Sequence, residues 1–340
     1  MLSSGTTTGP LNLITDVDGV SIGNRHDDRL NSGVTVAVFE RPATAAVSVL
    51  GGAPGTRDTD ALELQNVVEG ADAVVFAGGS SFGLDAATGA QSWLREAGRG
   101  ELFGGVRIPI VPQAICFDLV NGGDKDWGRF PPYRELAYEA AAAAAPGPFA
   151  IGSTGAGYGA TTADLRGGLG SASIVAASGI TIGALVVVNA LGSAVIGGGP
   201  HFWAAPYEAG AEFGGLGFPA ALTAEQMRLS WKGGRIQATT IALVACDAVL
   251  TRAMTKRLAI AAHGGLAKGL RLAHAIYDGD TVFAAATGHK LLADSNQTLI
   301  ELCALASDCL ARAIARAVHA ADPTPAGARM PPAWREKFGQ

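Results

Sequence analysis

The sequence is poor in aromatic and in charged residues. Of its 340 residues, 6% are aromatic and 16% are charged, whereas 48% are hydrophobic and 47 residues are glycine. Such an apolar chain buries a substantial core, which excludes intrinsic disorder as its main state. Because aromatics are scarce, the core has to consist mainly of alanine, valine, leucine and isoleucine, with small residues where strands pack on helices. The length is enough for two domains or for one large one.

The sequence also lacks a run of basic residues. Its 25 lysines and arginines are outnumbered by 30 acidic residues, which gives a net charge of −5. Nucleic acids and anionic membranes attract clustered positive charge, so we expect neither as a partner. The apolar stretch at residues 174–194 is interrupted by glycine, serine and asparagine and does not read as a membrane span. The polar N-terminus has no apolar signal segment, so we expect a cytoplasmic protein.

Motifs for metals and nucleotides are missing as well. The sequence has four cysteines but no CxxC pair: Cys116, Cys246, Cys303 and Cys309. Their apolar surroundings predict buried, reduced thiols. Without paired cysteines or an HExxH motif, no metal site is expected. The glycine-rich segment at residues 155–159 is spaced GxGxG rather than GxGxxG, so we expect no dinucleotide or other cofactor.

Alternating strand and helix patterns predict an α/β fold. We expect strands at residues 33–39, 45–50, 73–76, 109–112, 115–117, 171–175, 181–188, 239–245 and 281–286. We expect helices at residues 84–97, 134–145, 223–232, 250–263 and 294–321, with long loops at 119–132 and 200–219. The helix at 223–232 rests on Thr223 as N-cap with Gln226 three residues later. The tail after residue 323 is expected to be loosely held.

A GxSxG motif lies between a predicted strand and a predicted helix, at residues 79–83. This is the context of a nucleophile elbow, in which Ser81 would attack a substrate carbonyl with help from a downstream histidine. Five histidines follow it: His201, His263, His274, His289 and His319. The alternative is a tight glycine-rich turn in which Ser80 or Ser81 caps the helix. Because five residues with two fixed glycines arise easily in so glycine-rich a chain, we favour the turn.

A second group of polar residues precedes two apolar strands. Thr239 opens one strand directly after the glycine-containing stretch 233–238, and Asp278 and Asp280 precede another. Residues two apart in extended chain share a face, so both carboxyl groups can point the same way, where each raises the pKa of the other. The alternative is an ordinary Asp-Gly turn before a strand.

Six segments together give the chain a family resemblance. They are ITDVDGVSIG at 14–23, GGSSFGLDAA at 78–87, GAG at 155–157, VNALG at 188–192, TTIALVACD at 239–247 and DGDTVF at 278–283. In this order they resemble the self-processing N-terminal-nucleophile amidases. This family includes the L-aminopeptidase D-esterase/amidases, the β-peptidyl aminopeptidases and the 6-aminohexanoate-oligomer endohydrolases.

The resemblance implies a fold and an assembly. The fold is a four-layer α-β-β-α sandwich. Residues 1–238 form a large fragment and residues 239–340 a small fragment, which together make one structural domain. Members of the family assemble as homo-oligomers, often tetramers of such processed pairs. The substrates are small amine-bearing amides, peptides or esters.

The resemblance also implies roles for individual residues. The chain would be cut between Ala238 and Thr239, and Thr239 would become the nucleophile. Asn189 matches the residue that binds the oxyanion, and Asp278 and Asp280 match the pair beside the nucleophile. A free α-amino group has a pKa of about 7.7–8.0, so it can act as base for the hydroxyl of its own residue. Three further residues are expected to line the substrate pocket: Ser81, Phe117 and Gly157.

The sequence departs from the family at three positions. Residue 238 is alanine, where the family usually has asparagine and sometimes glycine. Phe117 stands near a place where some members have tyrosine or glutamate, and Arg166 only approximately fills the place of a basic residue before two glycines. Three hypotheses follow: a self-processed Thr239 amidase, a conventional serine hydrolase using Ser81, and an unprocessed binding protein in which Ala238 prevents cleavage.

Overall fold

The computed structural model describes residues 5–233, 238–324 and 327–339. Its strands are β1 Val20–Asp27, β2 Ser32–Val49, β3 Thr56–Arg57, β4 Gly70–Ala77, β5 Glu101–Phe103, β6 Val106–Ile108, β7 Gln113–Ile115, β8 Gly168–Val175, β9 Thr181–Asn189, β10 Thr239–Ala248 and β11 Thr281–Lys290. Its α-helices are α1 Ala86–Glu96, α2 Tyr133–Ala142, α3 Arg252–Gly269, α4 Ser295–His319 and α5 Trp334–Phe338. Short 3₁₀ helices include Ser80–Asp85 and Gly155–Gly157.

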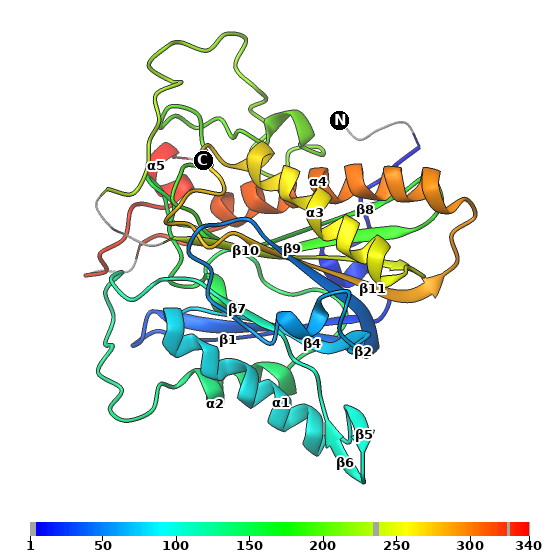
Figure 1. Cartoon of the computed structure of the whole chain (residues 1–340). Helices are drawn as coiled ribbons and strands as arrows, with labels where there is room; N and C mark the ends of the chain where they lie inside the picture. Colours follow the sequence, from blue (N-terminus) through cyan, green and yellow to red (C-terminus); the bar gives the residue numbers. More distant parts are fainter. Residues whose placement is uncertain (1–4, 234–237, 325–326, 340) are drawn as a thin grey trace.

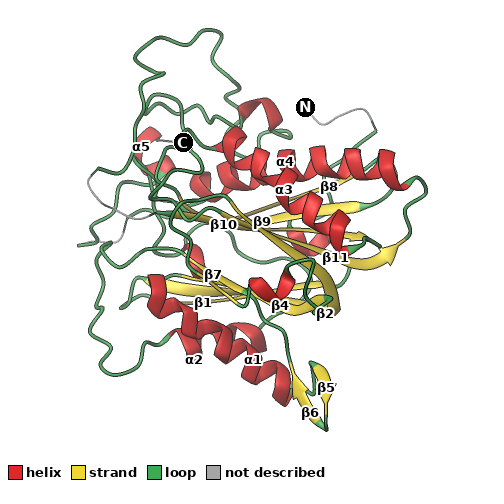
Figure 2. Cartoon of the chain, in the orientation of Figure 1, coloured by secondary structure: helices red, strands yellow, loops and turns green. Residues whose placement is uncertain are grey.

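Two helical layers enclose two β layers (Figure 1, Figure 2). Helices α1 and α2 cover one side, and α3 and α4 cover the other. Among the described residues, the nine strands of the main sheet run in the order β3-β7-β4-β2-β11-β10-β9-β8, and β1 pairs with β2. This arrangement is the four-layer α-β-β-α sandwich that the resemblance implies. Strands from both sides of the 238–239 bond share this sheet, since β10 and β11 lie between β9, which pairs with β10, and β2, which pairs with β11.

Strand β2 belongs to both β layers. Its first part pairs with β1 and β4, and its last part pairs with β11. The register against β4 shifts between Val38 and Ala43, where the strand bends from one layer into the other. Val34 and Val36 face α1 and α2, whereas Phe39 faces the space between the two β layers. The two stretches predicted at 33–39 and 45–50 are therefore one long, bent strand.

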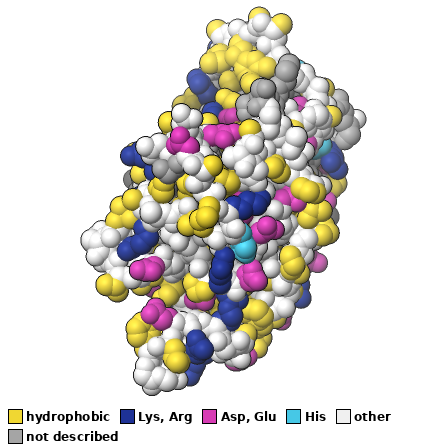
Figure 3. All heavy atoms as spheres, turned by 90° about the vertical axis from the view of Figure 1, so that its right-hand side faces the viewer, with side chains coloured by type: hydrophobic (Ala, Val, Ile, Leu, Met, Phe, Trp, Pro, Cys, Tyr) yellow, Lys and Arg dark blue, Asp and Glu magenta, His cyan; other side chains and the backbone are white. Residues whose placement is uncertain are grey.

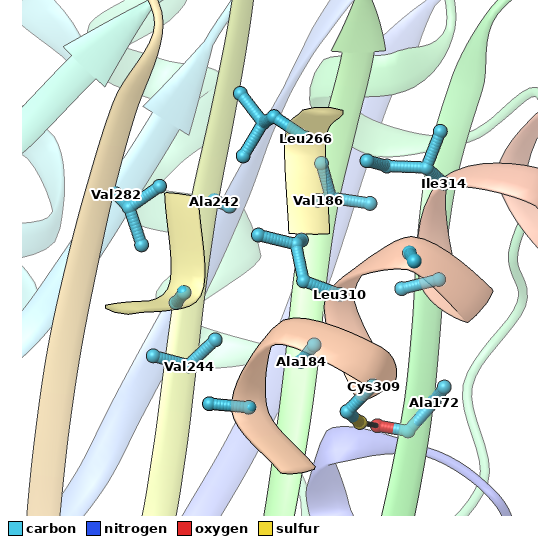
Figure 4. Close-up of a cluster of buried hydrophobic side chains, with 14 of the residues drawn as sticks. Ala172, Ala184, Val186, Ala242, Val244, Leu266, Val282, Cys309, Leu310 and Ile314 are labelled. Carbon is cyan, nitrogen blue, oxygen red and sulfur yellow. Dashed lines mark hydrogen bonds between the residues drawn. The ribbon is translucent and has the colours of Figure 1, made fainter. Parts of the chain in front are cut away.

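Small residues let α4 lie close to the sheet. Figure 4 shows Leu310 and Ile314 packed over alanine and valine side chains of the strands, with the Cys309 thiol donating a hydrogen bond of 3.1 Å to the Ala172 carbonyl. At Gly170 a Cβ atom would lie 2.0 Å from the backbone oxygen of Ala313. The excess of glycine and alanine in the sequence thus allows close packing of strand on helix.

The structure corrects three sequence predictions. Residues 109–112 form no strand, because β7 begins only at Gln113. Residues 223–232 form no helix, although Thr223 and Gln226 do exchange the hydrogen bonds of a capping box, at 3.0 and 3.2 Å. The following apolar residues Leu229 and Trp231 are about half exposed, at 54% and 49%, so no packed face stabilises a helix here. The tail after residue 323 is not loosely held, because Trp334 of α5 is fully buried and its Nε1 donates to Pro200 O at 3.0 Å.

The four cysteines are free thiols. Cys116, Cys246 and Cys309 are buried as predicted, and Cys303 is half-buried. No helix in the described part of the chain is long and apolar enough to cross a membrane. On the face shown in Figure 3, acidic and basic side chains are interspersed among apolar ones.

Candidate active site

Thr239 lies at the start of β10, in the middle of the sheet. It is opposite Asn189, the last residue of β9, in the antiparallel register. Both residues are buried, with 3% and 1% of their surface exposed. The antiparallel pairing of β9 and β10 therefore brings together two residues that lie 50 positions apart in the sequence.

The two acids lie beside the start of β10, in the chain that precedes the neighbouring strand β11. Ala238 forms a parallel bridge with Asp278, so the chain just before β10 lies beside the chain just before β11. Asp280 accepts the Thr240 N–H at 3.1 Å and the His274 N–H at 2.7 Å. Asp278 accepts the Leu191 N–H at 3.2 Å. The spacing of two residues thus gathers both carboxyl groups at the start of β10.

Burial and mutual repulsion shift the titration of this acid pair. Burial raises the pKa of Asp278, and the nearby charge of Asp280 raises it further. Burial also raises the pKa of Asp280, while hydrogen bonds from His274 and Thr240 lower it. The pair therefore holds a proton more tightly than two free aspartates do. Oδ1 of Asp278 is buried and has no hydrogen-bond partner among the described atoms.

The carbonyl of Ala238 is the group closest to the Thr239 hydroxyl. Thr239 Oγ1 donates a hydrogen bond of 2.5 Å to Ala238 O, and the Gly279 N–H donates to the same oxygen at 3.0 Å. The Ala238 N–H donates to Tyr277 O at 3.0 Å. Ala238 is therefore held through its N–H and its carbonyl, and the carbonyl oxygen of the 238–239 peptide bond accepts two donors.

Asn189 is fixed by three partners. Its Nδ2 donates to Phe117 O at 2.9 Å, and its Oδ1 accepts the Thr161 N–H at 3.0 Å and the Lys232 ammonium at 3.1 Å. Burial lowers the pKa of Lys232 to about 8, although Asp278 opposes the shift. The sequence analysis missed Lys232, because it lies in an irregular segment with no motif or periodicity around it.

A histidine pair lies behind the acids, although the sequence suggested both histidines only as possible partners of Ser81. His263 Nδ1 lies 3.0 Å from His274 Nε2, and His263 Nε2 lies 3.0 Å from Ser48 O. Since a carbonyl only accepts, His263 Nε2 carries the proton and His274 Nε2 donates to His263 Nδ1. Burial lowers the pKa of His263 to about 4, so this pair is neutral. His274 has a left-handed φ of 59°, which is uncommon without glycine, and its N–H donates to Asp280.

Two cavities flank the site. One, of about 530 Å³, is lined by Thr239, Ser80, Ser81, Phe117 and other residues of the loops at 53–56 and 80–84. The other, of about 310 Å³, is lined by Phe117, Lys232 and residues of loops 118–121 and 159–163. The structure thus places two of the residues expected to bind substrate, Ser81 and Phe117, on the cavity that Thr239 faces.

The GxSxG segment is a tight turn into a 3₁₀ helix. Gly79 and Ser80 have left-handed φ values of 80° and 52°, and the Gly79 N–H donates to the buried Asp118 at 2.7 Å. No described hydrogen bond joins Ser81 to a histidine. The downstream histidines contact other groups instead: Gly217 O for His201, each other for His263 and His274, Glu40 for His289 and Trp334 for His319. The geometry therefore gives Ser81 a place on the cavity wall and no catalytic partner.

Gly157 is closely packed in the fold, and Arg166 is hydrogen-bonded to backbone carbonyl groups. Gly157 is buried against β8, where a Cβ atom would lie 2.0 Å from the Leu169 nitrogen. Arg166 donates to the carbonyl oxygens of Tyr158, Asp322 and Pro323. The described residues that line the two cavities do not include Gly157, and its part in substrate binding stays a prediction. Within the described residues, no three His, Cys, Asp or Glu side chains gather as a metal site.

Comparison with known sequences identifies the family. The profile of peptidase family S58 matches residues 12–330. An uncharacterized aminopeptidase of Mycobacterium tuberculosis (strain ATCC 25618 / H37Rv) is 41% identical over 351 residues, covering 96% of this chain and 98% of that protein. A 6-aminohexanoate-oligomer endohydrolase of Kocuria sp. (strain KY2) is 28% identical over 292 residues, covering 83% of this chain and 76% of that protein.

Two solved structures share the fold. A Burkholderia sp. beta-aminopeptidase has a TM-score of 0.72 at 23% identity, with 96% of this chain and 92% of that chain covered. The L-aminopeptidase D-Ala-esterase/amidase from Ochrobactrum anthropi, described as a variant of the Ntn hydrolase fold, has a TM-score of 0.69 at 23% identity, with 94% and 90% covered. These matches confirm the resemblance and the layered fold expected from the sequence: the chain belongs to peptidase family S58.

Proposed function

We propose that the chain cuts itself between Ala238 and Thr239 and then hydrolyses amide, peptide or ester bonds of small amine-bearing substrates through an acyl-Thr239 intermediate. The observation that carries this proposal is the 2.5 Å contact between the Thr239 hydroxyl and the carbonyl oxygen of Ala238. The family, together with relatives that are named as aminopeptidases and oligomer hydrolases, supports an aminopeptidase or amidase.

Self-cleavage begins with an acyl shift. Thr239 Oγ1 attacks the carbonyl carbon of Ala238, and the bond from that carbon to the Thr239 nitrogen breaks. The nitrogen gains the hydroxyl proton and becomes an α-amino group, while Ala238 is left as an ester on Oγ1. Water hydrolyses the ester, which releases the Ala238 carboxylate and restores the hydroxyl. An alanine at position 238 is compatible with this chemistry, because the attacked group is a backbone carbonyl.

Turnover reuses the same oxygen. The free α-amino group takes the Oγ1 proton as Oγ1 attacks the substrate carbonyl, and the proton then goes to the leaving amine. The side-chain amide of Asn189 donates to the oxyanion, and water hydrolyses the acyl-Thr239 ester. Asp278 Oδ1 is buried and has no hydrogen-bond partner among the described residues, so it is suited to accept a hydrogen bond from the new amino group.

The cavity that Thr239 shares with Ser81 and Phe117 is the proposed substrate site. A panel of para-nitroanilides with free and blocked amines tests the expected preference for a free amine. The free compounds are expected to be cleaved faster, and equal rates would contradict the amine-bearing substrate class.

Two alanine variants separate the proposed nucleophile from its rival. Thr239→Ala should abolish both self-cleavage and amide hydrolysis. Ser81→Ala removes a hydroxyl from the cavity wall and should leave self-cleavage intact and hydrolysis measurable. Activity that survives Thr239→Ala but not Ser81→Ala would instead establish the conventional serine hydrolase.

A further inference from the structure

Self-cleavage and turnover place their oxyanions on different carbonyls. In turnover the oxyanion forms on the substrate, whereas in self-cleavage it forms on Ala238 O, within the chain. A negative oxygen in a buried site needs hydrogen-bond donors that are already in place. The donors on Ala238 O are the Gly279 N–H at 3.0 Å and the Thr239 hydroxyl at 2.5 Å. The hydroxyl is consumed as the nucleophile, so of the donors in the described part of the chain the N–H of Gly279 remains.

Asn189 is occupied elsewhere in the uncut chain. Its described donor contact is from Nδ2 to Phe117 O, at 2.9 Å. Its Oδ1 is held by the Thr161 N–H and the Lys232 ammonium, which fix the orientation of the side-chain amide. The described contacts of Asn189 do not include the Ala238 carbonyl, so the residue expected to serve turnover is not the one that holds the bond to be cut.

The Gly279 N–H is held rigidly in place. Its neighbour Asp278 donates its own N–H to Ala275 O at 3.0 Å and accepts the Ala53 N–H on its carbonyl at 2.9 Å. On the other side, the Thr281 hydroxyl donates to Gly279 O at 2.8 Å. The N–H is therefore directed at Ala238 O before any reaction begins, as electrostatic preorganisation requires.

Residue 279 also has to lack a side chain. A Cβ atom there would lie 2.6 Å from Thr239 Oγ1, 3.0 Å from Thr239 Cγ2 and 2.8 Å from Ala53 O. Because residue 279 is glycine, Thr239 can lie directly against the segment before β11 that supplies the N–H donor. The glycine of the DGD segment thereby meets both requirements of the cleavage step.

We propose that the backbone N–H of Gly279 is the oxyanion donor for self-cleavage, and that Asn189 serves substrate turnover alone. This rests on the proposed function, since it assumes that the Ala238–Thr239 bond is cut by Thr239. In the step, Oγ1 bonds to the Ala238 carbonyl carbon, the electron pair of the C=O bond moves to the oxygen facing Gly279, and its return expels the Thr239 nitrogen.

The direct test removes the backbone N–H donor of residue 279. Cell-free translation with glycolic acid in place of Gly279 replaces the N–H by an ester oxygen and adds no side chain. The matched control places glycolic acid at Gly104, whose surroundings are open. Self-cleavage is followed over time by gel electrophoresis, and resistance to limited proteolysis reports folding. We expect cleavage to slow about 10²-fold or more in the 279 chain and to stay at the parent rate in the 104 chain.

Two further variants keep the test decisive if the ester chain does not fold. Asn189→Ala should cleave itself within a few-fold of the parent rate, while its turnover falls about 10²–10³-fold. Gly279→Ala should slow self-cleavage, and Thr239→Ser in the same chain should restore part of the rate by removing the crowded Cγ2. Cleavage at the parent rate in the folded 279 ester chain overturns the proposal, as does a loss of cleavage in Asn189→Ala. If the parent is not cut, or Thr239→Ala still is, the proposed function itself fails.

Discussion

The Nζ atom of Lys232 lies 3.1 Å from the Oδ1 atom of Asn189, the residue opposite the proposed nucleophile Thr239 in the sheet. The two residues come from different parts of the chain: Asn189 ends the central strand β9, and Lys232 lies in irregular chain. Because the Lys232 ammonium donates to Oδ1 of Asn189, the Nδ2 hydrogens of Asn189 point away from Lys232. Lys232 thus orients the proposed oxyanion donor.

Replacing Lys232 by methionine keeps the aliphatic length and removes the charge. A hydrogen bond to a charged group contributes about 1.5–3 kcal/mol, so Lys232→Met should lower kcat about 10- to 150-fold. Steady-state kinetics on a para-nitroanilide measures the change. Lys268→Met, which loses an ion pair with Asp308 on the outer helices, is the matched control and should retain kcat. An unchanged kcat in Lys232→Met would contradict an orienting role.

Asp278 should make the uncut protein less stable as the pH rises. Its pKa is raised by burial and by Asp280, so the folded chain binds a proton that the unfolded chain has lost above about pH 4. In that window its contribution to stability falls by about 1.4 kcal/mol for each pH unit. The variant Asp278→Asn has no such proton to lose. In the uncut Thr239→Ala background, urea unfolding should show this variant gaining stability relative to the parent from pH 4 upward. A difference in unfolding free energy between the two proteins that stays constant with pH would exclude a raised pKa for Asp278.

His263 should have the opposite effect at acidic pH. Burial lowers its pKa to about 4, below the unfolded value of about 6.5, so the unfolded chain binds the extra proton between these values. Its contribution to stability is therefore complete above pH 6.5 and is lost as the pH falls toward 4. His263→Gln removes the titrating group, and its unfolding free energy should depend less on pH in this range than that of the parent. If the unfolding free energies of His263→Gln and the parent change in parallel with pH, the His263–His274 pair is not neutral.

Gly170 tests the packing of α4 on the sheet. Gly170→Ala places a Cβ atom 2.0 Å from Ala313 O, and backbone on both sides leaves little room to adjust. Overpacking of this kind costs about 1–3 kcal/mol, measured as a loss of unfolding free energy. Gly199→Ala is the control, because its nearest described atom is 3.3 Å away. Equal stability of the two variants would show that α4 lies farther from the strand.

Much of the fold could be predicted because it follows from residue periodicity. Val34, Val36 and Phe39 alternate between two buried faces of β2, and such alternation is visible in the sequence. The 223–232 segment shows where local signals mislead: its capping box forms, yet no surface packs against Leu229 and Trp231. Local hydrogen bonds begin a helix, but burial is needed to maintain it.

The residues of the candidate site also fall into those that the sequence predicted and those that it did not. Asp278 and Asp280 were found because a spacing of two places residues on one face, and Thr239 and Asn189 because their segments match family motifs. Lys232 and His274 lie in irregular chain, and their contacts with Asn189 and Asp280 depend on how distant loops meet. Periodicity carries no information about contacts between distant loops, so neither contact could be predicted from the sequence alone.

The intact mass of freshly purified protein tests the central claim most directly. Denaturing mass spectrometry should show fragments of about 24 kDa and about 10 kDa in place of 34.3 kDa, with the smaller beginning Thr-Thr-Ile. The Thr239→Ala protein should keep the full mass. A parent protein that hydrolyses amides while remaining a single 34.3 kDa chain would contradict self-activation at Thr239.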